Sequence, residues 1–104
     1  MLFRSVALAL ADVAAGVGAD WLPRIEAAQR AHPTEAAIQA AVGAVLVERQ
    51  LWGKARRPLE QAAADPTLAA RARRQAWRAL ARLAVEQGDD ERANACHRAA
   101  AAID

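Results

Sequence analysis

Two neighbouring residues near the C-terminus, Cys96 and His97, bring a thiol and an imidazole together, and both groups can bind a metal or a haem iron. Successive side chains of a helix point about 100° apart, so this pair is poorly placed to chelate one ion. We therefore expect His97 to pack inside the protein, and we keep haem ligation by His97 or Cys96 as an alternative. Because Cys96 is the single cysteine, an internal disulfide and a multi-cysteine metal site are both excluded.

The sequence lacks the motifs that mark common catalytic sites. It has no glycine-rich phosphate loop, no paired-cysteine haem motif and no Gly-x-Ser-x-Gly nucleophile turn. His32 precedes a proline, which is typical of a solvated turn. We therefore expect a protein that is not an enzyme, with no metal and no required cofactor.

Arginines form a more informative pattern. Arg71, Arg74, Arg78 and Arg82 are spaced three and four residues apart, so they share one face of a helix. Nine basic and two acidic residues lie between positions 49 and 82, a net charge of +7, while the remainder has a net charge of −5. This stripe indicates either a locally anionic partner or simply a well-solvated face of the helix. No aromatic or glycine-rich nucleic-acid motif accompanies it, so we expect no nucleic-acid binding.

The elements that carry these residues are predicted to be helices. Alanine, the strongest helix former, supplies 31 of 104 residues, whereas only four residues are aromatic. Breaking and capping residues divide the chain into helices near residues 3–15, 21–32, 35–48, 52–64, 65–86 and 90–102. The connections are short, so neighbouring helices should pack antiparallel. No run of 18 apolar residues occurs, so none of these helices is expected to span a membrane.

Local signals predict where several helices begin and end. Thr34 is expected to cap the helix over 35–48, and Asp65, followed by proline, the helix over 65–86. Pro58 is expected to kink the helix over 52–64. Gly88 should end the next helix, and Asp89 or the acid after it should cap the last one.

The helices also show an internal repeat. The last pair carries Trp77, Leu80 and Ala81, then Gly88 in the turn, then Ala93, His97 and Ala100. The middle pair carries Val42, Gly43 and Leu46, then Ala55, Leu59 and Ala62, with Pro66 beyond. The first pair is weaker, with Leu8, Ala9 and Gly16 followed by Ile25 and Ala28. This pattern resembles the tetratricopeptide repeat, in which small residues lie where two helices cross.

The repeat predicts an all-α domain of three stacked antiparallel hairpins, at about residues 3–32, 34–64 and 67–103. The first helix of each hairpin would line a concave groove that binds a partner. The groove residues expected from the helical phase are Val6, Leu10, Ala37, Ala40, Ala44, Val47, Gln75, Arg78 and Arg82. An apolar channel with arginines at one end suits an amphipathic helix with carboxylates, a porphyrin with propionates, or another copy of the chain. The alanines from Ala99 to Ala102 would leave an apolar end face, which predicts either self-association or further residues in the full-length protein.

One segment resembles a particular family. Leu51-Trp-Gly-Lys-Ala-Arg-Arg-Pro-Leu-Glu60, preceded by Trp21-Leu-Pro-Arg-Ile-Glu26, is similar to the C-terminal tetratricopeptide region of the HemY-like proteins of proteobacteria. Gly53 is expected to permit a close helix approach in this segment, and Trp52 to lie in the core. The family is associated with porphyrin and haem metabolism, and its members carry membrane-spanning helices ahead of the repeats.

The resemblance implies a soluble part of a protein that is anchored in the bacterial inner membrane. The function we expect is a scaffold for protein–protein interaction, with haem-pathway enzymes as candidate partners. The alternative is a domain that carries haem or porphyrin or responds to it. In either case we expect this part of the chain to make no contact with the membrane itself.

Overall fold

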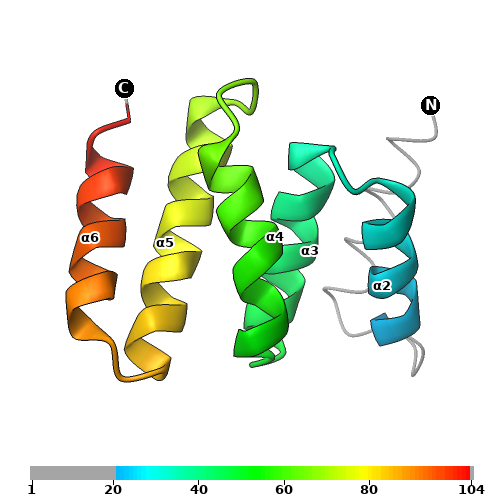
Figure 1. Cartoon of the computed structure of the whole chain (residues 1–104), viewed down its shortest axis with the longest axis horizontal. Helices are drawn as coiled ribbons and strands as arrows, with labels where there is room; N and C mark the ends of the chain where they lie inside the picture. The colour runs from blue at the N-terminus through cyan, green and yellow to red at the C-terminus, as the bar shows by residue number, and fades with distance from the viewer. Residues whose placement is uncertain (1–20, 104) are drawn as a thin grey trace.

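A computed structural model of the chain describes residues 21–103, and these form five α-helices with no strand among them. The helices are α2 (Trp21–Ala31), α3 (Ala36–Glu48), α4 (Trp52–Ala64), α5 (Ala70–Glu86) and α6 (Asp90–Ala101). Successive helices run in opposite directions and follow one another along the molecule in chain order (Figure 1). The helix expected over 3–15, with Val6 and Leu10, lies outside the described residues.

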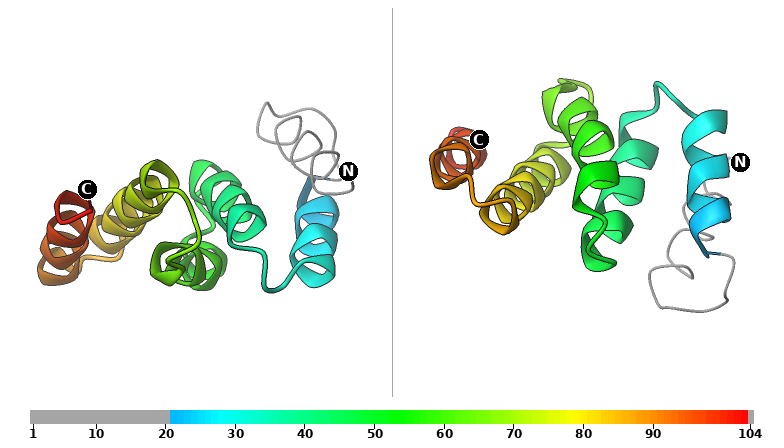
Figure 2. Two further views of the ribbon diagram at one scale, coloured as in Figure 1. Left: turned by 90° about the horizontal axis from the view of Figure 1, so that it is seen from above. Right: turned by 60° about the horizontal axis from the view of Figure 1, so that its bottom comes forward.

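The helices are not arranged in one flat layer. Seen from above, α3 and α5 lie on one side of the molecule and α4 on the other (Figure 2). Helix α3 therefore contacts α2, α4 and α5, while α6 packs mainly against α5 and reaches α4 through an ion pair between Arg92 and Glu60. None of the helices in residues 21–103 is long and apolar enough to cross a membrane.

The boundaries of α4 agree with the sequence prediction, and the helix is continuous through Pro58, which is buried. The predicted start of α5 was wrong: α5 begins at Ala70. Asp65 instead accepts hydrogen bonds at Oδ1 from the Thr67 amide, at 2.8 Å, and the Thr67 hydroxyl, at 2.6 Å. The bond from the Thr67 amide is the kind that an N-cap makes, but the single turn it begins does not continue into α5, because Ala69 is extended, with φ −54° and ψ 142°.

Two other capping predictions had different outcomes. The residue that caps α3 is Glu35 rather than Thr34, and its side chain makes no capping hydrogen bond. At α6 the prediction is confirmed: Asp89 is the N-cap, and its Oδ1 accepts a 3.0 Å hydrogen bond from the Arg92 amide.

The turns that follow α3 and α5 have the same backbone geometry. After α3, Gln50 has a φ of 61°, and the next amide, that of Leu51, donates to the Leu46 carbonyl at 2.9 Å. After α5, Gly88 has a φ of 77°, and the amide of Asp89 donates to the Ala84 carbonyl at 2.8 Å. Both turns are therefore Schellman motifs, in which one left-handed residue lets the chain reverse.

The core is built from aliphatic residues and alanines at the helix crossings. The small residues expected at these crossings are all buried: Gly43, Ala55, Ala62, Ala81, Ala93 and Ala100. Gly43 shows why size matters, because a Cβ built on it would lie 2.5 Å from the Leu59 side chain. A methyl group on α3 at this point would collide with α4 in their present arrangement.

Candidate functional site: a groove between α3 and α5

A groove of about 300 Å³ runs between α3 and α5, with α4 beneath it. Its walls and floor are Ala37, Ala40, Ala41, Ala44, Leu59, Leu68, Ala72, Gln75, Ala76 and Ala79. Four of these residues, Ala37, Ala40, Ala44 and Gln75, were predicted from the helical phase. The other six were missed, although Ala72, Ala76 and Ala79 share the helical periodicity of the face that includes Gln75.

Three predicted groove residues do not line the groove: Val47, Arg78 and Arg82. Val47 is only 4% exposed and belongs to the core, because the last turn of α3 is enclosed by neighbouring helices. The Nη1 of Arg82 lies 3.5 Å from Glu48 Oε1, and its guanidinium carbon lies 5.7 Å from the centre of the Trp52 ring, which is partly buried against the core. Arg82 therefore joins α5 to the neighbouring helices, a contact that sequence periodicity does not reveal.

The charges beside the groove come from α5. Arg71 and Arg78 are exposed, and they lie four residues before and three residues after Gln75, on the same helical face. Neither makes an ion pair with another residue of the described chain. We call these two residues the arginine edge. The opposite wall carries no charge between Ala36 and Val47, so both walls of the groove are apolar and only its α5 side has a cationic edge.

The other predicted member of the stripe, Arg74, is only partly exposed. Its neighbour Arg73 donates from Nε to the Leu68 carbonyl at 3.0 Å, and so ties α5 to the preceding loop. Because Leu68 lines the groove, this hydrogen bond helps to fix one end of it.

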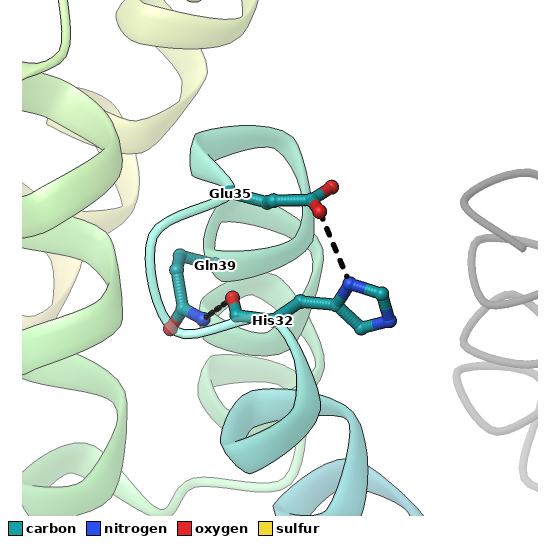
Figure 3. A network of polar contacts seen from close by, with 3 residues as sticks. All are labelled: His32, Glu35 and Gln39. Atoms are coloured by element: carbon teal, nitrogen blue, oxygen red, sulfur yellow. Dashed lines mark hydrogen bonds and ion pairs between the residues drawn. The ribbon is translucent and has the colours of Figure 1, made fainter.

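A polar network holds the connection between α2 and α3 (Figure 3). The His32 ring lies 3.2 Å from Glu35 Oε1, and the buried side chain of Gln39 donates to the His32 carbonyl at 2.8 Å. From α4, the side-chain amide of Gln61 donates from Nε2 to the Pro33 carbonyl. These contacts fix the start of α3, where Ala37 enters the groove wall. The roles of Gln39 and Gln61 were not predicted, because neither residue belongs to a recognised motif.

Cys96 and His97 lie on α6, away from the groove-lining residues. Cys96 is buried, and burial together with the carboxylates of Glu60 and Asp89 raises the pKa of its thiol. His97 is exposed, so the expectation that it packs inside the protein was wrong. Within residues 21–103, no group of three or more histidine, cysteine, aspartate or glutamate residues could hold a metal ion.

The outer surface of α6 is more polar than predicted. Ala101 and Ala102 are exposed, but Ala99 is partly covered and Ala100 is buried. The same helix also exposes five polar or charged side chains: Asp90, Glu91, Asn94, His97 and Arg98. The broad apolar end face expected from the alanine run is therefore not present on this helix.

A second hollow, of about 280 Å³, lies between α2 and α4. It is lined by Leu22, Ile25, Glu26, Gln29, Leu46, Gly53, Lys54 and Arg57. An ion pair between Lys54 and Glu26, with a separation of 3.7 Å, spans the two helices here. Gly53 borders open space, because a Cβ added to it would have no neighbouring atom within 4 Å, so the close approach expected at this glycine does not occur.

The helices and the groove together define a class: an all-α domain with an alanine-lined groove that has one cationic edge. Comparison of the chain with models of known protein families, with curated proteins and with solved structures found no significant match.

Proposed function

We propose that this chain is a non-catalytic helical-repeat module of the tetratricopeptide kind, and that it binds a protein partner in the groove between α3 and α5. The observation that carries the proposal is the lining of the groove. Its side chains are alanine or leucine at every position except Gln75, and the groove opens to solvent. Contiguous apolar surface that solvent can reach is typical of sites where another protein packs.

Correspondences between the helical pairs support the repeat. The interval along the chain between the left-handed residues of the two Schellman turns, Gln50 and Gly88, equals the interval between the buried alanines Ala55 and Ala93. The lateral contact of α3 with both α4 and α5 is also what stacked hairpins require.

Two ion pairs repeat in a similar way. Glu26 of α2 pairs with Lys54 of α4, and Glu60 of α4 pairs with Arg92 of α6 at 2.9 Å. Lys54 and Arg92 are as far apart along the chain as Gln50 and Gly88 are. Glu26 and Glu60 are closer together in the chain, by about one helical turn. In both places an acid on the second helix of one hairpin pairs with a base on the second helix of the next hairpin, as expected of a repeated unit.

A protein partner is favoured over haem or porphyrin. The groove is at the lower end of the range for small-molecule pockets, roughly 300 to 1,000 Å³. The two candidate iron ligands, Cys96 and His97, lie on α6 and do not line the groove. A buried thiol with a raised pKa is also a poor source of thiolate. Association with haem-pathway enzymes and an inner-membrane anchor rest on the sequence resemblance, and they remain predictions, as does self-association.

The experiment that tests this function fills the groove without disturbing the core. Ala44 is exposed and lines the groove, while Ala27 is exposed on α2 and does not. The bait is the full chain, used to capture proteins from cells that express it naturally. If the groove is the binding site, Ala44→Phe removes the partners that the wild type and Ala27→Phe retain. Retention of the same partners by Ala44→Phe would show that the site lies elsewhere.

A further inference from the structure

The two walls of the groove differ chemically, and the difference specifies the surface that can fill it. On α3 the wall is alanine and carries no charge, and on α5 the arginine edge runs beside the apolar lining. An occupant must therefore offer a small apolar face towards α3 and acidic groups towards α5. A uniformly apolar segment would leave the arginine edge without a partner, and a uniformly acidic segment would place charge against the alanines of both walls.

The lining also limits the backbone conformation of the occupant. Every residue of an extended peptide has an amide and a carbonyl that need hydrogen-bond partners when they are buried. Gln75 is the one side chain of the lining with hydrogen-bonding groups. A helix satisfies its own backbone groups, so it can lie against a wall of alanines without leaving them unpaired.

The spacing of the arginine edge sets the position of the acids. Arg71 and Arg78 are seven residues apart, which is two helical turns and about 10.5 Å along α5. A second helix that packs nearly parallel or antiparallel to α5 has side chains at the same separation when they are also seven residues apart. Gln75, which lies between the two arginines, can donate to or accept from a polar group between the acids.

We propose that the partner segment is an amphipathic α-helix with a small apolar face and with carboxylates seven residues apart along one edge, which pair with Arg71 and Arg78. This inference rests on the proposed function, because it names the occupant of the same groove. The arginines are exposed, so their contribution is moderate and depends on salt concentration. Packing against the alanines supplies the remainder of the affinity.

The probe is a capped helical peptide of alanine and leucine, about 18 residues or five turns long, with two glutamates seven residues apart on one edge. Three further peptides have glutamine in place of the glutamates, lysine in place of them, or the two glutamates moved to opposite faces. Binding of labelled peptide to the wild-type chain is measured by fluorescence anisotropy at low and high salt. We expect the glutamate peptide to bind about five- to tenfold more tightly than the glutamine peptide, with the difference lost at high salt. The lysine peptide and the peptide with separated acids should gain nothing.

Variants of the protein identify the groups responsible. Arg71→Gln and Arg78→Gln should each remove part of the preference for glutamate, and the double variant should remove all of it. Arg57→Gln is the matched control, because Arg57 is an exposed arginine in the middle of α4 that lines the other hollow. A preference that survives the double variant, or that Arg57→Gln removes, would overturn the inference.

The same peptides separate the two proposals. If the glutamate and glutamine peptides bind equally and Ala44→Phe weakens both, the groove is the binding site and the acidic partner is wrong. If the peptides bind and Ala44→Phe binds them as tightly as the wild type and Ala27→Phe do, the groove is not the binding site and the proposed function is contradicted. If no peptide binds, the acidic helix is wrong, and the capture experiment with Ala44→Phe decides the proposed function.

Discussion

Gly43 of α3 lies directly against Leu59 of α4: a Cβ on the glycine would be 2.5 Å from both Cγ and Cδ2 of the leucine. Leu59 is 1% exposed, and it also forms part of the floor of the groove. The close approach of α3 and α4 and the shape of the groove floor therefore depend on the same contact.

This contact predicts that Gly43→Ala destabilises the protein. Overpacking costs about 1–3 kcal/mol, and it is offset by about 1 kcal/mol from the better helix propensity of alanine. We expect a net loss of roughly 1 kcal/mol in the free energy of unfolding, measured by urea denaturation. Gly53→Ala is the control, because its methyl group meets no atom, and it should raise stability by about 0.5–1 kcal/mol. Effects of the same sign in the two variants would contradict the packing described for Gly43.

The two Schellman turns predict a pair of opposite effects. Gln50 adopts a left-handed conformation that disfavours side chains, so Gln50→Gly should raise the free energy of unfolding by about 1 kcal/mol. Gly88→Ala should lower the free energy of unfolding by a similar amount, because position 88 has a positive φ that alanine disfavours. Gln87, the C-cap of α5, has a φ of −89°, so Gln87→Gly should give no gain. A gain at Gln87 equal to that at Gln50 would show that the left-handed geometry is not the cause.

The buried thiol predicts a dependence of stability on alkaline pH. The pKa of Cys96 is raised in the folded state, so the unfolded chain loses this proton first as the pH rises above about 8.5. The contribution of the neutral thiol is fully present below that pH and is lost as the pH rises towards the folded-state pKa. The urea midpoint of the wild type should therefore fall more steeply above about pH 8.5 than that of Cys96→Ala. Equal slopes for the two proteins would argue against a raised pKa.

A disulfide reagent gives a second measurement on the same thiol. Cys96 should react far more slowly in the folded chain than in the chain unfolded by urea, because the thiol is buried and little of it is thiolate at neutral pH. Equal reaction rates in the two states would show that the thiol is accessible in the folded protein.

The turn at Asp65 predicts a shift that can be measured by NMR titration. Hydrogen bonds from the hydroxyl and the amide of Thr67 stabilise the Asp65 carboxylate and lower its pKa. The associated stability is present above the ordinary pKa of aspartate and is lost as the pH falls through the lowered value. Thr67→Ala removes the hydroxyl donor, so it should move the pKa of Asp65 part of the way back. Thr34→Ala, in the turn between α2 and α3, should leave the pKa of Asp65 unchanged. A shift of the Asp65 pKa in this control would contradict the role of the Thr67 hydroxyl.

Much of the fold could be predicted because alanine content and helix breakers act locally. The ends of α4, the Gly88 turn and the Asp89 cap depend on the conformational preferences of a few adjacent residues. The start of α5 was wrong for a local reason as well: Asp65 caps an isolated turn with Thr67, and the extended Ala69 separates this turn from the helix. Two competing local structures share the same signal in the sequence.

The site was harder to predict, because exposure depends on which helix covers which. Leu59 and His97 occupy corresponding positions of the repeat, but Leu59 is on α4, which packs against both α3 and α5, whereas His97 is exposed on α6, at the end of the row of described helices. Val47 and Arg82 have the periodicity of groove residues, yet one is enclosed in the core and the other pairs with Glu48. Periodicity identified the wall at Ala37, Ala40 and Ala44, and tertiary contacts decided where the groove ends.

The central claim is that a partner helix binds between α3 and α5, and mapping of the binding surface by NMR tests it most directly. The isotope-labelled chain is titrated with the peptide that carries glutamates seven residues apart, and changes in amide chemical shift are followed. The claim predicts that the largest changes occur at Ala40, Ala44, Gln75 and Ala79, with little change on α6. Largest changes at Gly53 and Arg57, in the hollow between α2 and α4, or along α6, would contradict it.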